Sequence, residues 1–185
     1  GQQTTVMRHS RIPQYVIKVY FDNEVEPKEW EHWIKRIKGA AAIEAAIKKR
    51  KYTSLFVVPK KWIYRLPELP ALPIEGNYVR RHFVLIAEHM PILSKPENKW
   101  AYRLQMNRSK LKKLFTLITE VGMSDSLRPT NVPWTYQKQL AFLDTERFHE
   151  WPIDYQQMLE FLNPEMRKYW KSLIVDQKRR KSLQK

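Results

Sequence analysis

Cysteine is absent from this chain of 185 residues. Its absence excludes a disulfide framework and any metal site built on thiolates. Apolar runs are short, and none approaches the roughly 20 residues that a membrane-spanning helix needs. The first residues lack the apolar stretch of a secretory signal peptide, so we expect a cytoplasmic protein, or a bacterial effector that is secreted by another route.

Negative charge is also scarce, with 19 Asp and Glu against 34 Lys and Arg, for a formal net charge of +15. This balance predicts an acidic partner: nucleic acid, an anionic membrane surface, nucleotide phosphates or an acidic protein. The densest basic run, residues 178–181, is equally typical of a solvated helix end. Hydrophobic residues make up 43% of the chain, enough for a folded core, which excludes a disordered protein.

Three runs rich in β-branched and aromatic residues predict strands in the first half of the chain. Lys18 lies in the first run among apolar neighbours, and Pro59 predicts an edge position or a bulge in the second. A proline-rich loop, residues 66–73, follows the second run. The three expected strands cover residues 15–21, 54–64 and 82–88.

Apolar residues at helical spacing predict helices. Trp30, Trp33 and Trp170 fall on such stripes, so we expect all three in the core. Gly39 is expected to end the first helix, and the chain around Lys95 to be irregular. The expected helices cover residues 28–37, 40–50, 109–121 (with Ser109 as a candidate cap), a segment from Ile153 to Leu162, and a last one from Pro164.

Strands therefore come first and helices last, which is an α+β order. We expect a small antiparallel sheet with one or two helices in residues 1–90. A mainly helical part should follow in residues 91–185. The two parts would form one compact domain with two lobes.

Residues 125–146 are the most informative stretch. They predict a loop ending at Asn131, a crossing, and an apolar strand over residues 139–144 that ends at Asp144. An amide and a carboxylate would thus lie at the two ends of a short hairpin. ATP-dependent phosphotransferases use such a pair to hold Mg²⁺ against nucleotide phosphates.

Taken in order, these segments resemble the protein-kinase-like fold. Val16-Ile17-Lys18 resembles the strand that carries the phosphate-binding lysine, and Glu44 resembles the helix acid that pairs with it. Residues 83–90 look like the strand that enters the hinge, so the backbone near Glu88 and Met90 would bind adenine.

Two further motifs carry the resemblance. Leu127-Arg128-Pro129-Thr130-Asn131 is similar to the family's Leu-Lys-Pro-Glu-Asn, and residues 140–144 resemble the strand that ends in the metal-binding aspartate. The resemblance implies ATP and Mg²⁺ as cofactors, with Asn131 and Asp144 as metal ligands, Lys18 on the phosphates and Glu44 orienting Lys18.

The chain also departs from the family. The catalytic aspartate should stand five residues before Asn131, but that position is Ser126, and Asp125 would serve only across a one-residue bulge. Residues 1–14 contain no Gly-rich phosphate loop, and Thr145-Glu146 replaces the usual Phe-Gly. His-Arg-Asp and Ala-Pro-Glu motifs are missing. These departures indicate a divergent, minimal, bacterial-type kinase or a pseudokinase.

Three functions follow from these observations. The first is an ATP- and Mg²⁺-dependent phosphotransferase acting on an unknown acceptor, such as an acidic protein or a phosphorylated molecule. The second is a catalytically silent kinase-like scaffold, which Ser126 favours. The third is a nucleic-acid-binding module, which the charge and the seven Trp residues favour. The five His residues show no metal-ligand spacing, so a histidine-based enzyme has the least support.

Overall fold

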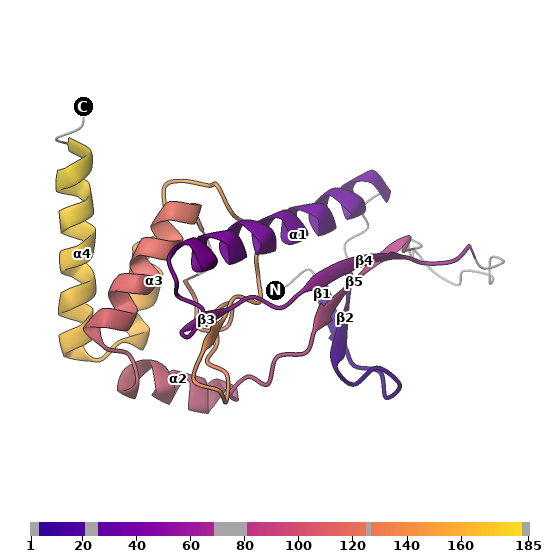
Figure 1. The fold of residues 1–185 in the computed structure, drawn as a ribbon, viewed down its shortest axis with the longest axis horizontal. Coiled ribbons are helices and arrows are strands. Elements are labelled where there is room, and N and C mark those ends of the chain that lie inside the picture. Colours follow the sequence, from indigo (N-terminus) through magenta and orange to yellow (C-terminus); the bar gives the residue numbers. More distant parts are fainter. Residues whose placement is uncertain (1–3, 21–25, 69–80, 125–126, 183–185) are drawn as a thin grey trace.

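The computed structural model describes residues 4–20, 26–68, 81–124 and 127–182. Its main sheet is antiparallel with strand order β1-β2-β5-β4, and β3 pairs in parallel with β6 apart from it (Figure 1). The strands are β1 (Thr4–Met7), β2 (Tyr15–Tyr20), β3 (Phe56–Val57), β4 (Lys61–Arg65), β5 (Phe83–Glu88) and β6 (Leu140–Ala141). The helices are α1 (Glu26–Lys49), α2 (Lys95–Leu104), α3 (Arg108–Val121), the 3₁₀ helix η1 (Tyr155–Phe161) and α4 (Pro164–Ser182).

The expected α+β class with a small antiparallel sheet is confirmed. Within the described residues, no helix is long and apolar enough to cross a membrane. The order of the elements follows the expected one, with most strands before residue 90 and most helices after it. The division into two lobes at this point stays a prediction.

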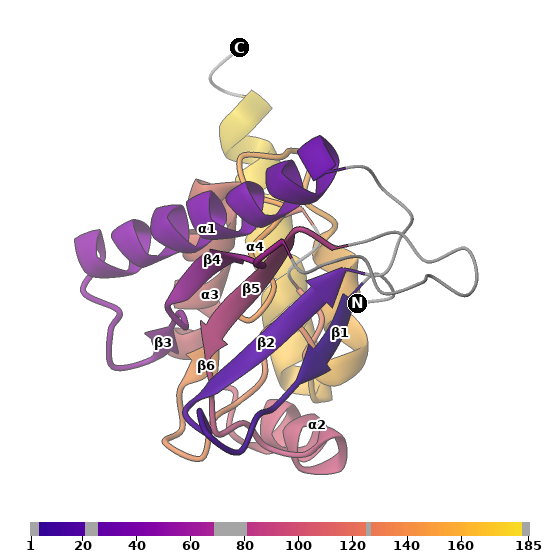
Figure 2. The ribbon, with the colours of Figure 1, turned by 90° about the vertical axis from the view of Figure 1, so that its right-hand side faces the viewer.

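Helix α1 joins the sheet to the helical part (Figure 1). Near its first half, Trp33 packs with Tyr20 and Leu85 in a small core on one face of the sheet. Along its second half, Ile43 and Ile47 belong to the larger core that α3 and α4 share. Figure 2 shows α1 lying along one side of the sheet. Helix α1 therefore contributes to both cores.

The expected break of this helix at Gly39 is wrong, because α1 runs without interruption through this residue. A Cβ atom added to Gly39 would lie 1.7 Å from the carbonyl oxygen of Thr145. Glycine at this position therefore allows the backbone after β6 to touch the helix. The residue serves close packing and does not end the helix.

The expected strand over residues 54–64 is two strands in different sheets, β3 and β4. Pro59 lies between them, and it lacks the N–H group that a continuous ladder would need. The later strand, expected over residues 139–144, is regular only in β6. Of the proline-rich loop 66–73, residues 69–73 lie outside the described residues.

Two helix boundaries also differ from the expected ones. The stretch around Lys95 is not irregular but begins α2, since Ser94 and Glu97 form a capping box and Pro96 lies in the first turn. Helix α3 is capped by Asn107 in place of Ser109, and it ends as expected at Gly122, which has a left-handed backbone. The segment expected as a helix from Ile153 is the 3₁₀ helix η1.

The tryptophans divide between core and surface. Trp33 and Trp170 are fully buried, as expected. Trp30 was also expected in the core, but it is 44% exposed and its ring packs against Phe83 near the N-terminal end of α1. The small core beneath α1 contains Trp33 but not Trp30.

Candidate functional site

Lys18 occupies the centre of β2 and points to the face of the sheet that α1 covers. Its register partner on β5 is Leu85, which is buried in the core beneath α1. Lys18 is partly buried, and no hydrogen bond or ion pair joins its ammonium group to another residue of the described segments. Burial and the nearby charge of Arg36 lower the pKa of Lys18, and Asp144 offsets part of this effect.

Asn131 and Asp144 come together through a short hairpin. The Leu143 N–H donates to the Asn131 carbonyl at 2.9 Å, and the Ala141 N–H donates to the Pro133 carbonyl at 2.9 Å. Asp144 therefore follows directly after the residue that pairs with Asn131. The backbone pairing thus places Asp144 one residue beyond the partner of Asn131, and both side chains carry oxygen, the atom type that Mg²⁺ prefers.

Arg36 extends from α1 to the end of this hairpin. Its Nη2 donates to Oε2 of Glu146 at 2.9 Å, and its Nη1 lies 3.9 Å from Oδ1 of Asp144. Nδ1 of His32 lies 2.7 Å from the other carboxylate oxygen of Glu146. Burial alone would raise the pKa of Asp144, but the charges of Arg36 and Lys18 outweigh burial and lower it. Asp144 is therefore held as a carboxylate.

Lys61 lies beneath the same segment. The side chain is buried, and Nζ donates to Oγ1 of Thr145 at 2.6 Å and to the Leu143 carbonyl at 3.2 Å. Thr145 in turn donates to the Arg36 carbonyl at 2.6 Å. Burial, followed by the charges of Lys18 and Arg36, lowers the pKa of Lys61 well below its ordinary value. This network ties β4, α1 and the strand end together.

The structure does not bring Glu44 to Lys18. Glu44 forms an ion pair with Lys48, and half of its side chain is exposed to solvent. Arg36 stands eight residues earlier on the same helix, about 12 Å along its axis at 1.5 Å per residue. Because α1 is one continuous helix, the position that faces the hairpin end belongs to Arg36.

Glu88 and Met90 lie where β5 leaves the sheet. The Glu88 N–H donates to the Lys60 carbonyl, and the Glu88 carboxylate accepts from the Lys60 N–H at 2.9 Å. The Met90 carbonyl accepts from the Ile92 N–H at 2.9 Å. Adenine binding by this segment stays a prediction. Asp125, the expected base, and Ser126 lie outside the described residues.

Sequence reasoning missed three charged residues of the site: Arg36, Lys61 and Glu146. A signal existed for Lys61, which alternates with the exposed Trp62 and so had to face inward. Gly39 inside a helical pattern was a second signal, since such a glycine indicates close packing. The partner of Arg36, by contrast, is 110 residues away in sequence.

The site thus gathers three cations and two carboxylates where β2, β4, α1 and the hairpin end meet. Among the residues that the structure describes, no group of three or more His, Asp or Glu could by itself hold a metal ion. In comparisons with known proteins, no family model, no curated protein and no solved structure matches the chain.

Proposed function

We propose that this chain is a divergent kinase-like domain that binds a nucleotide polyphosphate with Mg²⁺ and transfers its terminal phosphoryl group. The observation that carries the proposal is the position of Lys18. It is a partly buried cation that no described carboxylate pairs with, yet it lies within the electrostatic reach of Asp144. A lysine in this state favours an anionic ligand, because burial without a counter-charge is costly.

Asn131 and Asp144 fit a magnesium ion. Both supply oxygen, and Mg²⁺ in nucleotide sites commonly rests on one or two protein oxygens while the phosphates and water complete its shell. When bound, the ion would neutralise charge that develops on the phosphates. The lowered pKa of Asp144 keeps this ligand deprotonated.

Lys18 would hold the phosphates that are not transferred, since phosphoryl transfer asks the protein mainly for charge placement. The backbone of the segment at Glu88 and Met90 would receive the adenine. Arg36 and Glu146, rather than Glu44, would keep α1 in position against the hairpin end. Asp125 would orient the acceptor, and the positive surface suits an acidic protein or a phosphorylated acceptor.

One observation favours a second candidate, a catalytically silent kinase-like scaffold. Arg36 lies within 3.9 Å of Asp144, so the protein's own cation already faces the carboxylate that would hold the metal. In this alternative, ATP would bind without a metal and no phosphoryl transfer would follow.

A thermal-shift titration with ATP, with and without Mg²⁺, separates the two candidates. A ligand that binds only the folded state at 100 times its Kd adds about 2.7 kcal/mol of stability. Phosphotransferase function predicts a rise in Tm that Mg²⁺ enlarges, that Asp144→Asn loses, and that accompanies ATP turnover. A rise in Tm that is independent of Mg²⁺ and equal in wild type and Asp144→Asn would rule out the phosphotransferase and favour the scaffold.

A further inference from the structure

The apolar side chains most exposed to solvent gather at one end of the molecule. Among the described residues, the three most exposed large apolar side chains are Leu104 at 75%, Tyr136 at 62% and Trp100 at 60%. Trp100 and Leu104 lie one helical turn apart on α2, so they share one face of this helix. Ile92, just before α2, is also exposed.

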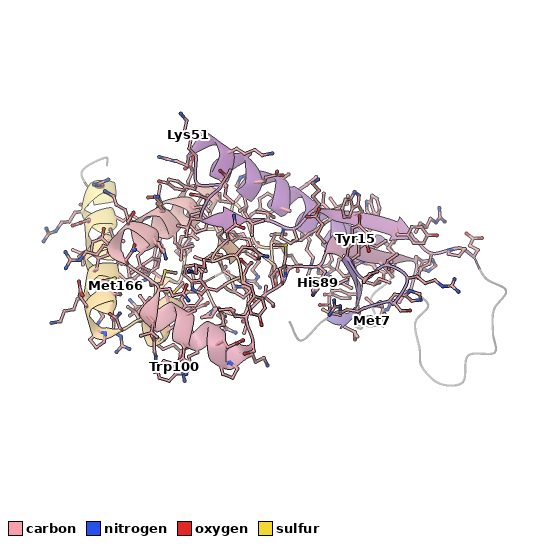
Figure 3. All side chains as sticks on the ribbon, turned by 60° about the horizontal axis from the view of Figure 1, so that its bottom comes forward. Met7, Tyr15, Lys51, His89, Trp100 and Met166 are labelled. Atoms are coloured by element: carbon pink, nitrogen blue, oxygen red, sulfur yellow. The ribbon has the colours of Figure 1, made fainter. Side chains whose placement is uncertain are left out.

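Tyr136 belongs to the hairpin tip, which the backbone joins to the start of α2. The Tyr136 N–H donates to the Pro91 carbonyl at 3.0 Å, and Ile92 forms a β-bridge with Thr135. Figures 1 and 2 both show this tip and α2 at the same lower end of the molecule. In Figure 3 Trp100 projects from the outer side of α2. We call Ile92, Trp100, Leu104 and Tyr136 the apolar end.

Basic residues surround the apolar end. Lys95 and Lys99 are exposed on α2, Lys138 is exposed at the hairpin tip, and Arg103 lies over the Trp100 ring at 6.0 Å. Within the described residues, none of these four cations forms an ion pair with a carboxylate. Glu97, the acidic residue of α2, accepts hydrogen bonds from the N–H and hydroxyl groups of Ser94 at the start of the helix. The surface therefore combines apolar contact with unpaired positive charge.

The opposite face of α2 holds the helix rigidly in place. The buried amide of Asn98 donates to the Pro129 carbonyl at 2.8 Å and accepts from the Trp134 N–H at 2.9 Å. The Tyr102 hydroxyl donates to the Val132 carbonyl at 2.6 Å. Exposure of Trp100 and Leu104 is thus a fixed property of the fold, because turning α2 to bury them would break these buried hydrogen bonds.

We propose that the apolar end and its basic rim form a docking surface for an anionic lipid membrane. Trp and Tyr are enriched at membrane–water interfaces, and Lys and Arg are attracted by anionic headgroups. The aliphatic side chains Ile92 and Leu104 distinguish a membrane from nucleic acid, since they neither stack on bases nor contact phosphates but gain from burial among acyl chains. This surface is separate from the nucleotide site and does not depend on the proposed activity.

Sedimentation with vesicles tests the surface. Wild-type protein is expected to sediment with vesicles of phosphatidylcholine and phosphatidylserine, and much less with phosphatidylcholine alone. The double change Trp100→Ala and Leu104→Ala should lower the partition coefficient at least about tenfold through lost apolar burial. Lys95→Glu with Lys99→Glu should lower it by roughly 30-fold or more.

Two matched controls separate this surface from the general positive charge. Trp30→Ala removes an exposed tryptophan of α1, and Lys168→Glu with Lys171→Glu reverses two exposed charges of α4. Both should retain most of the binding, and near-ultraviolet circular dichroism checks that every variant is folded. Equal loss in both charge-reversal pairs, full binding by the Trp100 and Leu104 variant, or no sedimentation with anionic vesicles would each overturn the proposal. Tighter, Trp100-dependent binding to single-stranded DNA would assign the surface to nucleic acid and also overturn it.

Discussion

Arg36 of α1 donates a hydrogen bond from Nη2 to Oε2 of Glu146, 2.9 Å away, across 110 residues of sequence. The guanidinium group is almost fully buried, and it also lies over the Trp33 ring at 5.4 Å. His32 binds the second oxygen of Glu146. This pair joins α1 to the hairpin end, whereas the sequence had predicted that the helix contributes Glu44 to orient Lys18.

Replacing Arg36 by Met should destabilise the fold by roughly 3 kcal/mol, because it removes the positive charge that faces Glu146 and Asp144 in a largely buried site. The measurement is urea unfolding at neutral pH. Arg50→Met is the matched control, since Arg50 pairs with Glu120 on the surface and its loss should change stability little. Equal unfolding midpoints for the two variants would show that the Arg36 pair does not stabilise the fold.

Gly39→Ala should destabilise the protein by roughly 2 kcal/mol or more, although alanine is normally the better helix residue. The added methyl group would meet the Thr145 carbonyl at 1.7 Å, and that atom belongs to the backbone. Urea unfolding measures the change. Ala45→Gly, at an exposed position of the same helix, should cost only about 1 kcal/mol of helix propensity. A Gly39→Ala protein more stable than wild type would refute the close contact.

Lys61 predicts a pH dependence of stability. Its pKa is lowered in the folded state and lies near 10.5 in the unfolded chain, so between these values the unfolded chain binds a proton that the folded protein lacks. Stability from this group therefore rises with pH in that window and is lost as pH falls through the folded pKa. Lys61→Met should remove the rise.

Urea unfolding between pH 7 and pH 10 measures the effect as the difference between wild type and Lys61→Met. Lys60→Met is the control, because Lys60 is the exposed neighbour in sequence. A difference between wild type and Lys61→Met that stays constant with pH would mean that Lys61 keeps an ordinary pKa in the folded protein.

Local sequence patterns sufficed for much of the fold. The β-branched runs located β2 and β5, and apolar spacing located α3 and α4. The loop ending at Asn131 and the apolar run ending at Asp144 predicted the hairpin between these two residues. In each case the deciding signal lies within a few residues of the element itself.

Other features depended on contacts that no local window contains. Gly39 lowers helix propensity by about 1 kcal/mol, and its close contact with Thr145 explains why glycine occupies this position of α1. Because α1 continues, Arg36 and not Glu44 faces the strand end. The role of Lys61 in the site could not be predicted for a related reason, since its partners Leu143 and Thr145 come from the other half of the chain.

Calorimetric titration with ATP is the sharpest test of our proposal that Lys18 and Asp144 belong to a nucleotide site. Lys18→Met is compared with Lys60→Met, which removes the same charge from the exposed surface. We expect Mg²⁺ to strengthen ATP binding to wild type and to Lys60→Met. Lys18→Met should bind ATP at least about tenfold more weakly, a loss of about 1.4 kcal/mol. Equal ATP affinity of the two lysine variants, with no effect of Mg²⁺, would rule out a specific site at Lys18. ATP would then bind only through general attraction to a protein of net charge +15.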